Sequence, residues 1–527
     1  MMSLLTLSVS AAFARADGET LNFLSATLGS HMVLQRAPSR ATVWGVTAKG
    51  AIVTTTMSSS TSTSTFTSVA DVNGTWRQLL PATPGNSQTA YNFTFTSTNS
   101  TSERAELTDV LFGDVYLCGG QSNMEYGMPA VTNMTIEKQD ANNYPHIRFF
   151  SVGHATQSST PLRDLQTVWE PWQVASNTSI CKDFSAHAHL FSTFSAVCWL
   201  AGKRLSDALT QMSSASNESN VVVPIGLISN NWGGTKVEVW TPAKTYETCN
   251  GTAPPPFPNG GPMWNSMILP YAQGPMSLSG IWWYQGEADT ATSATAELYS
   301  CTFPSMISEW RRAFASPNLY FGFVQLSTWC ALPPNSLPEM RRAQMSALAL
   351  PNVAYATNAD HGLGCTIHPA AKQYVGVRIA NSALNLNYGQ NISWKSPTYA
   401  SAKQEEEAAT TGEVRVRVKL RDIGARGLHL VYPNNYEGEV MWVAPPTFVN
   451  CSATTPYDMS KQCAWASINV QGVGWVNASV EVHPNEPPFT EMDLVASGVS
   501  GTVLSTSYGS YLLLLLARTA LLLLLFL

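Results

Sequence analysis

The sequence is short of charge. Of its 527 residues 12% are charged, about half the usual share of roughly 25%, and no run of basic residues occurs. The net charge is −6. This pattern gives no reason to expect binding to nucleic acid. Polarity comes instead from Ser, Thr and Asn, a composition that suits an extracellular surface.

Closely spaced cysteine pairs are also missing. None of the nine cysteines belongs to a C-x-x-C pair, so the sequence does not predict a structural zinc site. The cysteines favour disulfides instead, and their odd number leaves at least one without an intramolecular partner. Ten N-x-S/T sequons point the same way, because they indicate passage through the secretory pathway.

No apolar run is long enough for a comfortable membrane span. The apolar C-terminal stretch, residues 511–527, is short and is interrupted by Arg518. Small residues at 497–501 and a short spacer precede it, an order that is typical of a GPI-anchor signal. We therefore expect residues 496–527 to be such a signal, with a hydrophobic tail anchored in the membrane as the alternative.

The N-terminus has the pattern of a signal peptide. Residues 4–14 are apolar and run into Ala14-Arg15-Ala16, which matches the small residues of a cleavage site. We expect residues 1–16 to be removed, with an uncleaved terminus as the alternative. The expected location is extracellular or at the cell surface, and the lysosome is the alternative.

The rest of the chain divides into three segments by its apolar pattern. Residues 17–105 carry short strand candidates between Gly and Pro turns, and residues 390–495 return to strands, with period-two alternation over residues 413–420. Residues 106–389 alternate short apolar runs with amphipathic segments. This alternation predicts an α/β fold, in which helices cover both faces of a mostly parallel sheet that is flanked by small β modules.

Buried strands and covering helices are expected to alternate through the middle segment. The expected strands are residues 115–118, 147–152, 221–229, 280–284, 319–326 and 353–356, and the expected helices are residues 194–209, 296–314, 339–350 and 369–384. Active sites of such sheets lie at the carboxyl ends of the strands. Catalytic residues are therefore expected in the loops that follow these strands.

A serine follows the first of these strands. Gly119 and Gly120 allow the chain to turn sharply off the strand, which brings Ser122 to the carboxyl edge of the sheet. A serine in that place can act as a nucleophile if a base lies near it. Capping of the next helix is the more common use of such a serine.

Three later loops bring further polar groups to the same edge. Two glycines follow the strand at 221–229, and the backbone N–H of Gly233 or Gly234 could donate to an oxyanion; an ordinary glycine turn is the alternative. Gln285 and Glu287 follow the strand at 280–284, where a carboxylate is costly unless it is paired. His368 lies after the strand at 353–356 and suits a general base, with His361 as the competing candidate.

These motifs together resemble the sialate O-acetylesterase family, a branch of the SGNH hydrolases. Gly120-Gln-Ser-Asn-Met124 resembles the family's nucleophile block, and the further blocks follow in the family's order. They are Trp232-Gly-Gly-Thr235, Trp283-Tyr-Gln-Gly-Glu287 and Ile367-His-Pro369. The resemblance implies a flavodoxin-like SGNH hydrolase domain of three α/β/α layers over residues 106–389.

The resemblance also implies roles for these residues. Ser122 is implied as the nucleophile and His368 as the base. The backbone N–H groups of Ser122 and Gly234, together with the Gln285 amide, are implied as donors to the oxyanion. No metal or organic cofactor is implied.

The acid of the triad is less clear. Cys365 stands at the position that often holds it, three residues before His368, and a thiol cannot serve. Asp360 is the expected acid, and Glu287 is the alternative. The site could also work as a Ser–His pair steadied by backbone carbonyls.

The implied reaction removes O-acetyl groups from a carbohydrate, with sialic acid as the expected substrate. Arg341 or Arg342 could clamp the sialic acid carboxylate, although an exposed helix face is the other interpretation of both residues. An esterase of acetylated xylan or another plant polysaccharide is an alternative function. A sugar-binding surface protein without catalysis is an alternative from a different class.

Overall fold

The computed structural model describes residues 19–514, apart from residues 155–156, 185–189, 216–221, 250–256, 275, 328, 330–335, 360–361, 363–365, 406–412, 424–446, 450–460, 464–465, 483–490, 498–502 and 509–510. The expected signal peptide, residues 1–16, lies outside the described residues, as do residues 515–527 of the expected tail. Among the described residues, no helix is long and apolar enough to cross a membrane.

A mostly parallel sheet forms the centre of the molecule. Its strands run in the order β13-β12-β11-β7-β10-β8-β9, and all neighbours are parallel except β8 and β9. The strands are β7 (Arg104–Gly120), β8 (Ile147–Val152), β9 (Val168–Val174), β10 (Ile225–Asn231), β11 (Gly280–Tyr284), β12 (Tyr320–Gln325) and β13 (Val353–Thr357). The predicted α/β class is confirmed, and each predicted strand overlaps an observed one.

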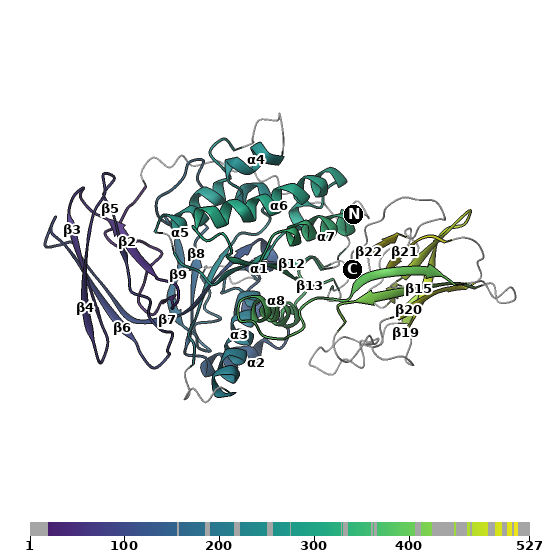
Figure 1. Ribbon diagram of the computed structural model, residues 1–527, viewed down its shortest axis with the longest axis horizontal. Helices are drawn as coiled ribbons and strands as arrows, with labels where there is room; N and C mark the ends of the chain where they lie inside the picture. Colours follow the sequence, from purple (N-terminus) through teal and green to yellow (C-terminus); the bar gives the residue numbers. More distant parts are fainter. Residues whose placement is uncertain are drawn as a thin grey trace, which may run out of the picture.

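Helices lie on both sides of this sheet (Figure 1). On one side α3 (Ala196–Ala215) packs against α8 (Lys372–Leu386), near α2 (Met134–Asp140). On the other side α6 (Ser293–Ala313) packs against α4 (Ala243–Cys249) and α7 (Ser336–Met345). The remaining α-helices are short: α1 (Ser122–Glu125) and α5 (Leu269–Gln273). The four predicted helices correspond to α3, α6, α7 and α8.

An N-terminal group of strands precedes the central sheet. It contains β1 (Val33–Gln35), β2 (Thr42–Val46), β3 (Ile52–Ser58), β4 (Thr63–Val69), β5 (Thr75–Leu79) and β6 (Tyr91–Ser97). Strand β3 lies between β4 and β6, and β2 pairs with β5, all antiparallel. The β-rich character that the sequence predicts for this segment is thus observed.

Strand β7 belongs to both parts of the molecule. Its first residues pair with β6, and its last residues pair with β10 and β11. Residues 104–109 include exposed positions, whereas residues 110–120 are all buried. That change is expected where a strand leaves a sheet with one solvated face and enters a sheet covered on both faces. The expected boundary at residue 105 falls inside this strand.

A second sheet forms the C-terminal part. It contains β14 (Thr398–Gln404), β15 (Glu413–Arg421), β18 (Ala466–Val470), β19 (Gly474–Val482), β20 (Glu491–Ser497), β21 (Val503–Tyr508) and β22 (Tyr511–Leu514), while β16 (Thr447–Val449) pairs with β17 (Lys461–Cys463). In β15 the alternate residues Val414, Val416, Val418 and Leu420 are buried, as the period-two pattern predicts. Strands β21 and β22 fall within the segment expected to be a GPI-anchor signal, which stays a prediction.

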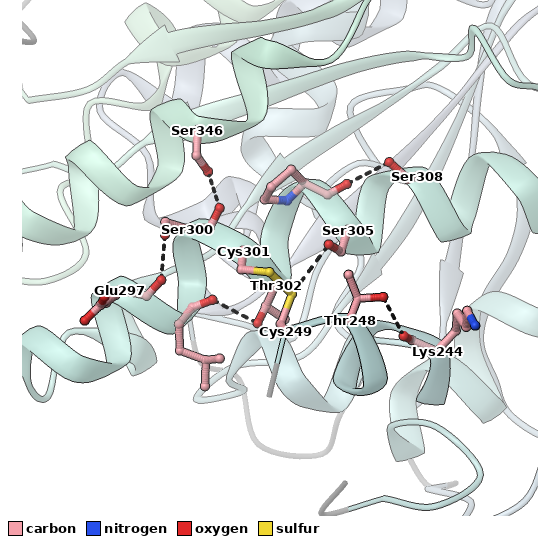
Figure 2. The surroundings of a disulfide bond; sticks show 12 residues. Lys244, Thr248, Cys249, Glu297, Ser300, Cys301, Thr302, Ser305, Ser308 and Ser346 are labelled. Carbon is pink, nitrogen blue, oxygen red and sulfur yellow. Dashed lines mark hydrogen bonds between the residues drawn. A yellow bond between two sulfur atoms is a disulfide. The ribbon is translucent and has the colours of Figure 1, made fainter. Parts of the chain in front are cut away.

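Two disulfides occur among the described residues. Cys118 on β7 is bonded to Cys198 on α3, and Cys249 at the end of α4 is bonded to Cys301 on α6. Figure 2 shows the second bond, with Ser305 of α6 beside the sulfur of Cys249. Cys181 is a free thiol. The preference for disulfides is therefore confirmed at four cysteines.

Candidate active site

Ser122 lies just beyond the carboxyl end of β7, in the middle of the central sheet. The chain turns at Gly120, where φ is +139°, a conformation that favours glycine. A Cβ atom at Gly120 would lie 2.1 Å from the carbonyl oxygen of Tyr284 on the neighbouring strand β11. Glycine is therefore required at this turn. Ser122 then opens helix α1.

The hydroxyl of Ser122 meets the imidazole of His368. His368 Nε2 lies 2.7 Å from Ser122 Oγ, and the ring of Phe191 packs against the imidazole with 5.2 Å between ring centres. Burial and, to a smaller extent, the charge of Lys372 lower the pKa of His368 to about 4. The imidazole is therefore neutral at neutral pH, so Nε2 can accept the proton of the hydroxyl.

Asn123 ties the serine turn to the histidine loop. Its amide nitrogen donates to the carbonyl oxygen of Ile367, at 2.9 Å, and to Glu287 Oε1, at 2.5 Å. Its amide oxygen accepts from Lys372 Nζ. Asn123 follows Ser122 in the chain and Ile367 precedes His368, so one side chain fixes the backbone on both sides of the reacting pair.

A buried carboxyl and a buried amine flank Asn123. Both side chains are almost fully buried. Burial raises the pKa of Glu287 to about 7, and burial lowers the pKa of Lys372 to about 7, in each case partly offset by the other residue. The amine also lies over the ring of Tyr126, 4.8 Å from its centre. Both groups are therefore held in a dry site and reach each other through the Asn123 amide.

The acid position of a triad is not filled from the described residues. Asp360, the expected acid, lies outside them. Glu287, the alternative, bonds Asn123, and within the described ranges no carboxylate lies within hydrogen-bonding distance of the His368 ring. Glu287 therefore contacts the reacting pair through Asn123 rather than directly.

A glycine turn follows β10 and passes beside the serine. Its first residue, Trp232, donates its backbone N–H to the carbonyl oxygen of Gly120, at 3.0 Å. A Cβ atom at Gly233 would lie 3.4 Å from that of Ser122, whereas one at Gly234 would meet nothing within 4 Å. Among the described residues, the backbone N–H groups of Ser122 and Gly234 have no hydrogen-bond partner. Their role as oxyanion donors stays a prediction.

Gln285 is fully buried at the end of β11. Its amide nitrogen donates to Asp289, to the carbonyl oxygen of Thr235 at 3.1 Å and to Gln121 Oε1 at 3.3 Å. Tyr299 donates its hydroxyl to the amide oxygen at 3.0 Å. Gln285 thus joins the serine turn to the glycine turn, and its role as an oxyanion donor stays a prediction.

Comparison with known proteins decides the family. A sequence model described as carbohydrate esterase, sialic acid-specific acetylesterase, matches residues 112–385. The sialate O-acetylesterase of Rattus norvegicus is 32% identical over 456 residues, which cover 75% of this chain and 79% of that protein. The chain belongs to this esterase family. The sialate O-acetylesterase of Homo sapiens is also 32% identical, over 73% of this chain and 74% of that protein.

A solved structure agrees with the fold of the esterase. A carbohydrate acetylesterase from Xanthomonas citri superposes with a TM-score of 0.66 at 22% identity, and the match covers 94% of each chain. At this identity the match shows the fold alone. The family resemblance predicted from the motifs is confirmed, and the matched residues 112–385 contain Ser122, Gly234 and His368.

The two predicted substrate arginines of the esterase differ in their surroundings. Arg341 is buried on α7 and donates from Nε to the carbonyl oxygen of Leu326, at 2.7 Å. Arg342, the next residue, is exposed. Binding of a substrate carboxylate by either residue stays a prediction. In the part of the chain that the structure describes, no cluster of three or more His, Cys, Asp or Glu side chains could hold a metal ion.

Sequence reasoning missed two residues of the site. Asn123 stood inside the quoted nucleophile block, but nothing in the sequence showed that its amide spans two loops. Lys372 lies four residues after His368, at the start of a helix, where a lysine is usually solvated. The one available signal was that Lys372 lies on the face of the helix that is buried against the core.

Proposed function

We propose that this esterase hydrolyses O-acetyl esters of sialic acids through an acetyl-serine intermediate. The observation that carries the proposal is the 2.7 Å contact between Ser122 Oγ and His368 Nε2, because a serine hydroxyl becomes a nucleophile when a base can take its proton. The family description and the rat and human relatives support sialic acid as the sugar.

The proposed reaction has two halves. His368 takes the proton of Ser122 as the serine oxygen attacks the acetyl carbonyl carbon, and the backbone N–H groups of Ser122 and Gly234 bind the oxyanion. The tetrahedral intermediate expels the sugar oxygen, which receives the proton from His368. A water molecule, deprotonated by His368, then attacks the acetyl-enzyme, and acetate leaves as the serine regains its proton.

In the proposed mechanism, two groups assist His368: one holds its loop and the other stabilises its protonated form. Asn123 anchors its loop and carries the contact to Glu287. Asp360 remains the predicted acid of the triad, with Glu287 in a supporting place. An acid beside the free ring nitrogen would stabilise the imidazolium that forms in each half of the reaction.

The proposed fold of residues 106–389 is the three-layer SGNH hydrolase arrangement. The parallel strands β10, β7, β11, β12 and β13, with helices on both sides, support it. So does the position of Ser122 at the carboxyl end of a central strand, which is where ligands of open α/β sheets bind.

The proposed location is the secretory pathway and the cell surface. The two disulfides support it, because such bonds persist in oxidising compartments. Release from cells by a phosphatidylinositol-specific phospholipase would test the predicted GPI anchor. Retention on the membrane after that treatment would speak for a tail anchor.

Fluorophosphonate labelling tests the proposed mechanism. We expect the wild type to be labelled and to release acetate from O-acetylated sialic acid, and Ser122→Ala to lose labelling and at least about 10⁴-fold in kcat. Ser206 offers a matched control, because its hydroxyl contacts His146 Nε2 at 2.6 Å at the amino end of β8. Ser206→Ala should be labelled like the wild type.

The alternatives predict other results. Faster hydrolysis of acetylated xylan than of O-acetylated sialic acid would favour the plant-polysaccharide esterase. Sugar binding without labelling or acetate release would favour the non-catalytic surface protein.

A further inference from the structure

A buried carboxyl that the proposed reaction does not use lies one turn beyond the nucleophile. Glu125 ends helix α1, with 8% of its surface exposed. Its Oε2 atom accepts the backbone N–H of Gly233 at 2.5 Å, and its Oε1 atom faces His154 Nδ1 at 3.6 Å. Burying a carboxyl group costs free energy unless the group is hydrogen-bonded. The contacts of Glu125 therefore indicate its role.

The imidazole of His154 holds the same turn from the other side. His154 Nε2 lies 2.5 Å from the carbonyl oxygen of Asn231. A carbonyl oxygen only accepts hydrogen bonds, so Nε2 carries the ring proton and Nδ1 presents its lone pair toward Glu125. The ring also stacks on the indole of Trp232, with 4.4 Å between ring centres and 9° between planes.

The last residue of β10 and the first two residues of the turn are therefore contacted by two side chains. His154 holds the carbonyl of Asn231 and the indole of Trp232, and Glu125 holds the N–H of Gly233. We propose that Glu125 and His154 are positioning residues that set the Gly234 amide as an oxyanion donor. The inference rests on the proposed function and adds to it the means by which the donor is held.

The turn needs such support because of its composition. Two successive glycines give the backbone a wide choice of conformations, and Gly234 itself has a φ of +71° with open space around it. An oxyanion donor has to lie about 2.7–3.1 Å from the position of the oxyanion. The bond from the Gly233 N–H to Glu125 narrows the orientations that the next amide can adopt.

The charge of the pair should matter as well as its geometry. Burial raises the pKa of Glu125 to about 8 and lowers the pKa of His154 to about 4, so both are neutral at pH 7. Of the described groups packed against α1 from β7, β10, β11 and α3, none places a charge on this carboxyl. His368 and Lys372 contact Ser122 and Asn123 instead. Ionisation of Glu125 above pH 8 would therefore set an uncompensated negative charge beside the developing oxyanion.

Three variants test the inference in steady-state kinetics with O-acetylated sialic acid. We expect Glu125→Ala to lower kcat about 10²-fold, the loss expected for a misplaced donor, with KM within about threefold. Glu125→Gln should stay within about fivefold of the wild type at pH 7, because its amide oxygen still accepts from Gly233. Glu137→Gln is the matched control: Glu137 is equally buried, but it pairs with Lys203 on α3.

The pH profile separates a positioning role from a merely structural one. We expect kcat of the wild type to fall above pH 8 and kcat of Glu125→Gln to stay level there. An alkaline fall that persists in Glu125→Gln, or an unchanged kcat in Glu125→Ala, would overturn the inference. These results are read only if Ser122→Ala is inactive, since activity in that variant would overturn the proposed function itself.

A second variant covers a failure of Glu125→Ala to fold. His154→Phe keeps a ring against Trp232 but loses the contact with Asn231. We expect a fall in kcat of about tenfold at unchanged KM and with a thermal midpoint close to that of the wild type. An unchanged kcat in this folded variant would contradict the positioning role of Glu125 and His154.

Discussion

At the scale of single residues, the proposed mechanism makes the protonation of the His368 imidazole the acid limit of the reaction. Burial lowers the pKa of His368 to about 4, below its ordinary value of about 6.5. The base is lost only when the ring is protonated, so kcat/KM should stay level from neutral pH down to about pH 5 and fall with a midpoint near 4. Initial rates of acetate release across pH 3.5 to 7 measure it. A midpoint at 6.5 or above would contradict the buried environment.

The neighbouring amine should move that limit in a known direction. A positive charge near an imidazole disfavours its protonated form, and Lys372 acts in this sense on His368. Lys372→Met should therefore move the acid midpoint of kcat/KM to a higher pH. Lys203→Met, which removes a lysine paired with Glu137 and Asp140, should leave the midpoint in place. A shift to lower pH would contradict the assignment.

Asn123 should matter to rate more than its stability contribution suggests. Asn123→Ala removes the hydrogen bond to the Ile367 carbonyl that anchors the His368 loop, so we expect kcat to fall about 10²-fold. The unfolding free energy should fall by about 2 kcal/mol, because buried partners lose a hydrogen bond. Urea unfolding and acetate release measure the two effects.

A variant of Asn265 separates the effect on kcat from the effect on stability. Its amide is also fully buried and donates to the carbonyl oxygens of Ser158 and Gly260, away from the reacting pair. Asn265→Ala should lose a similar amount of stability but keep kcat within a few-fold. Equal losses of kcat in both variants would make the effect of Asn123 a general one of stability.

The sequence predicted the Ser–His pair, but it did not predict the buried side chains that hold this pair in place. Ser122 and His368 could be predicted because each follows a strand whose carboxyl end must lie at one edge of the sheet. Glu125, Asn123 and Lys372 could not, because polar side chains are ordinarily placed on the surface. Only their contacts in three dimensions show that they are buried, that Lys372 bonds Asn123 and that Glu125 bonds Gly233.

At the scale of elements, burial on both faces made the central strands easy to predict. Strand β8 begins and ends where the predicted strand at 147–152 does, and all six of its residues are buried, including the polar residues Arg148 and Ser151. Strand β9 was missed. It carries Pro171, its one exposed position, and its antiparallel pairing at the sheet edge tolerates a proline that a central strand does not. Edge strands thus have a weaker apolar pattern in the sequence than central strands.

The turn after β7 should resist any side chain. Gly120→Ala would place its Cβ atom against the carbonyl of Tyr284 and force a strained φ, so we expect a loss of more than about 3 kcal/mol of unfolding free energy. Gly50→Ala is the control, with a φ of +77° and nothing within 4 Å of its Cβ position. It should cost about 1–2 kcal/mol, the price of the backbone conformation alone. Similar losses in urea unfolding would show that the β11 contact is unimportant.

At the scale of the whole molecule, covalent and hydrogen-bonded links converge on the strand that leads to Ser122, the proposed nucleophile. Strand β7 extends from the N-terminal strands into the central sheet (Figure 1). Near its end, Cys118 is bonded to Cys198 on α3, the helix that packs against α8. Since α8 follows the His368 loop, the disulfide joins the supports of both reacting residues. Rigidity of the site therefore depends on elements far apart in the sequence.

The two disulfides should separate stability from catalysis. They close loops of similar length, with sequence separations of 80 and 52 residues, so loop entropy gives each about 4 kcal/mol of stabilisation. Replacing either pair by serine should therefore lower the thermal midpoint by a similar amount.

Of these two disulfides, Cys118–Cys198 is the one close to Ser122, so its loss alone should lower kcat. Cys118→Ser with Cys198→Ser should lower kcat about tenfold at a temperature where the protein is still folded, because the end of β7 is freed. Cys249→Ser with Cys301→Ser, which frees α4 from α6 (Figure 2), should leave kcat within about twofold. Equal rates in the two double variants would mean that the β11 and β10 pairings alone hold the serine turn, and the covalent link to α3 would then serve stability only.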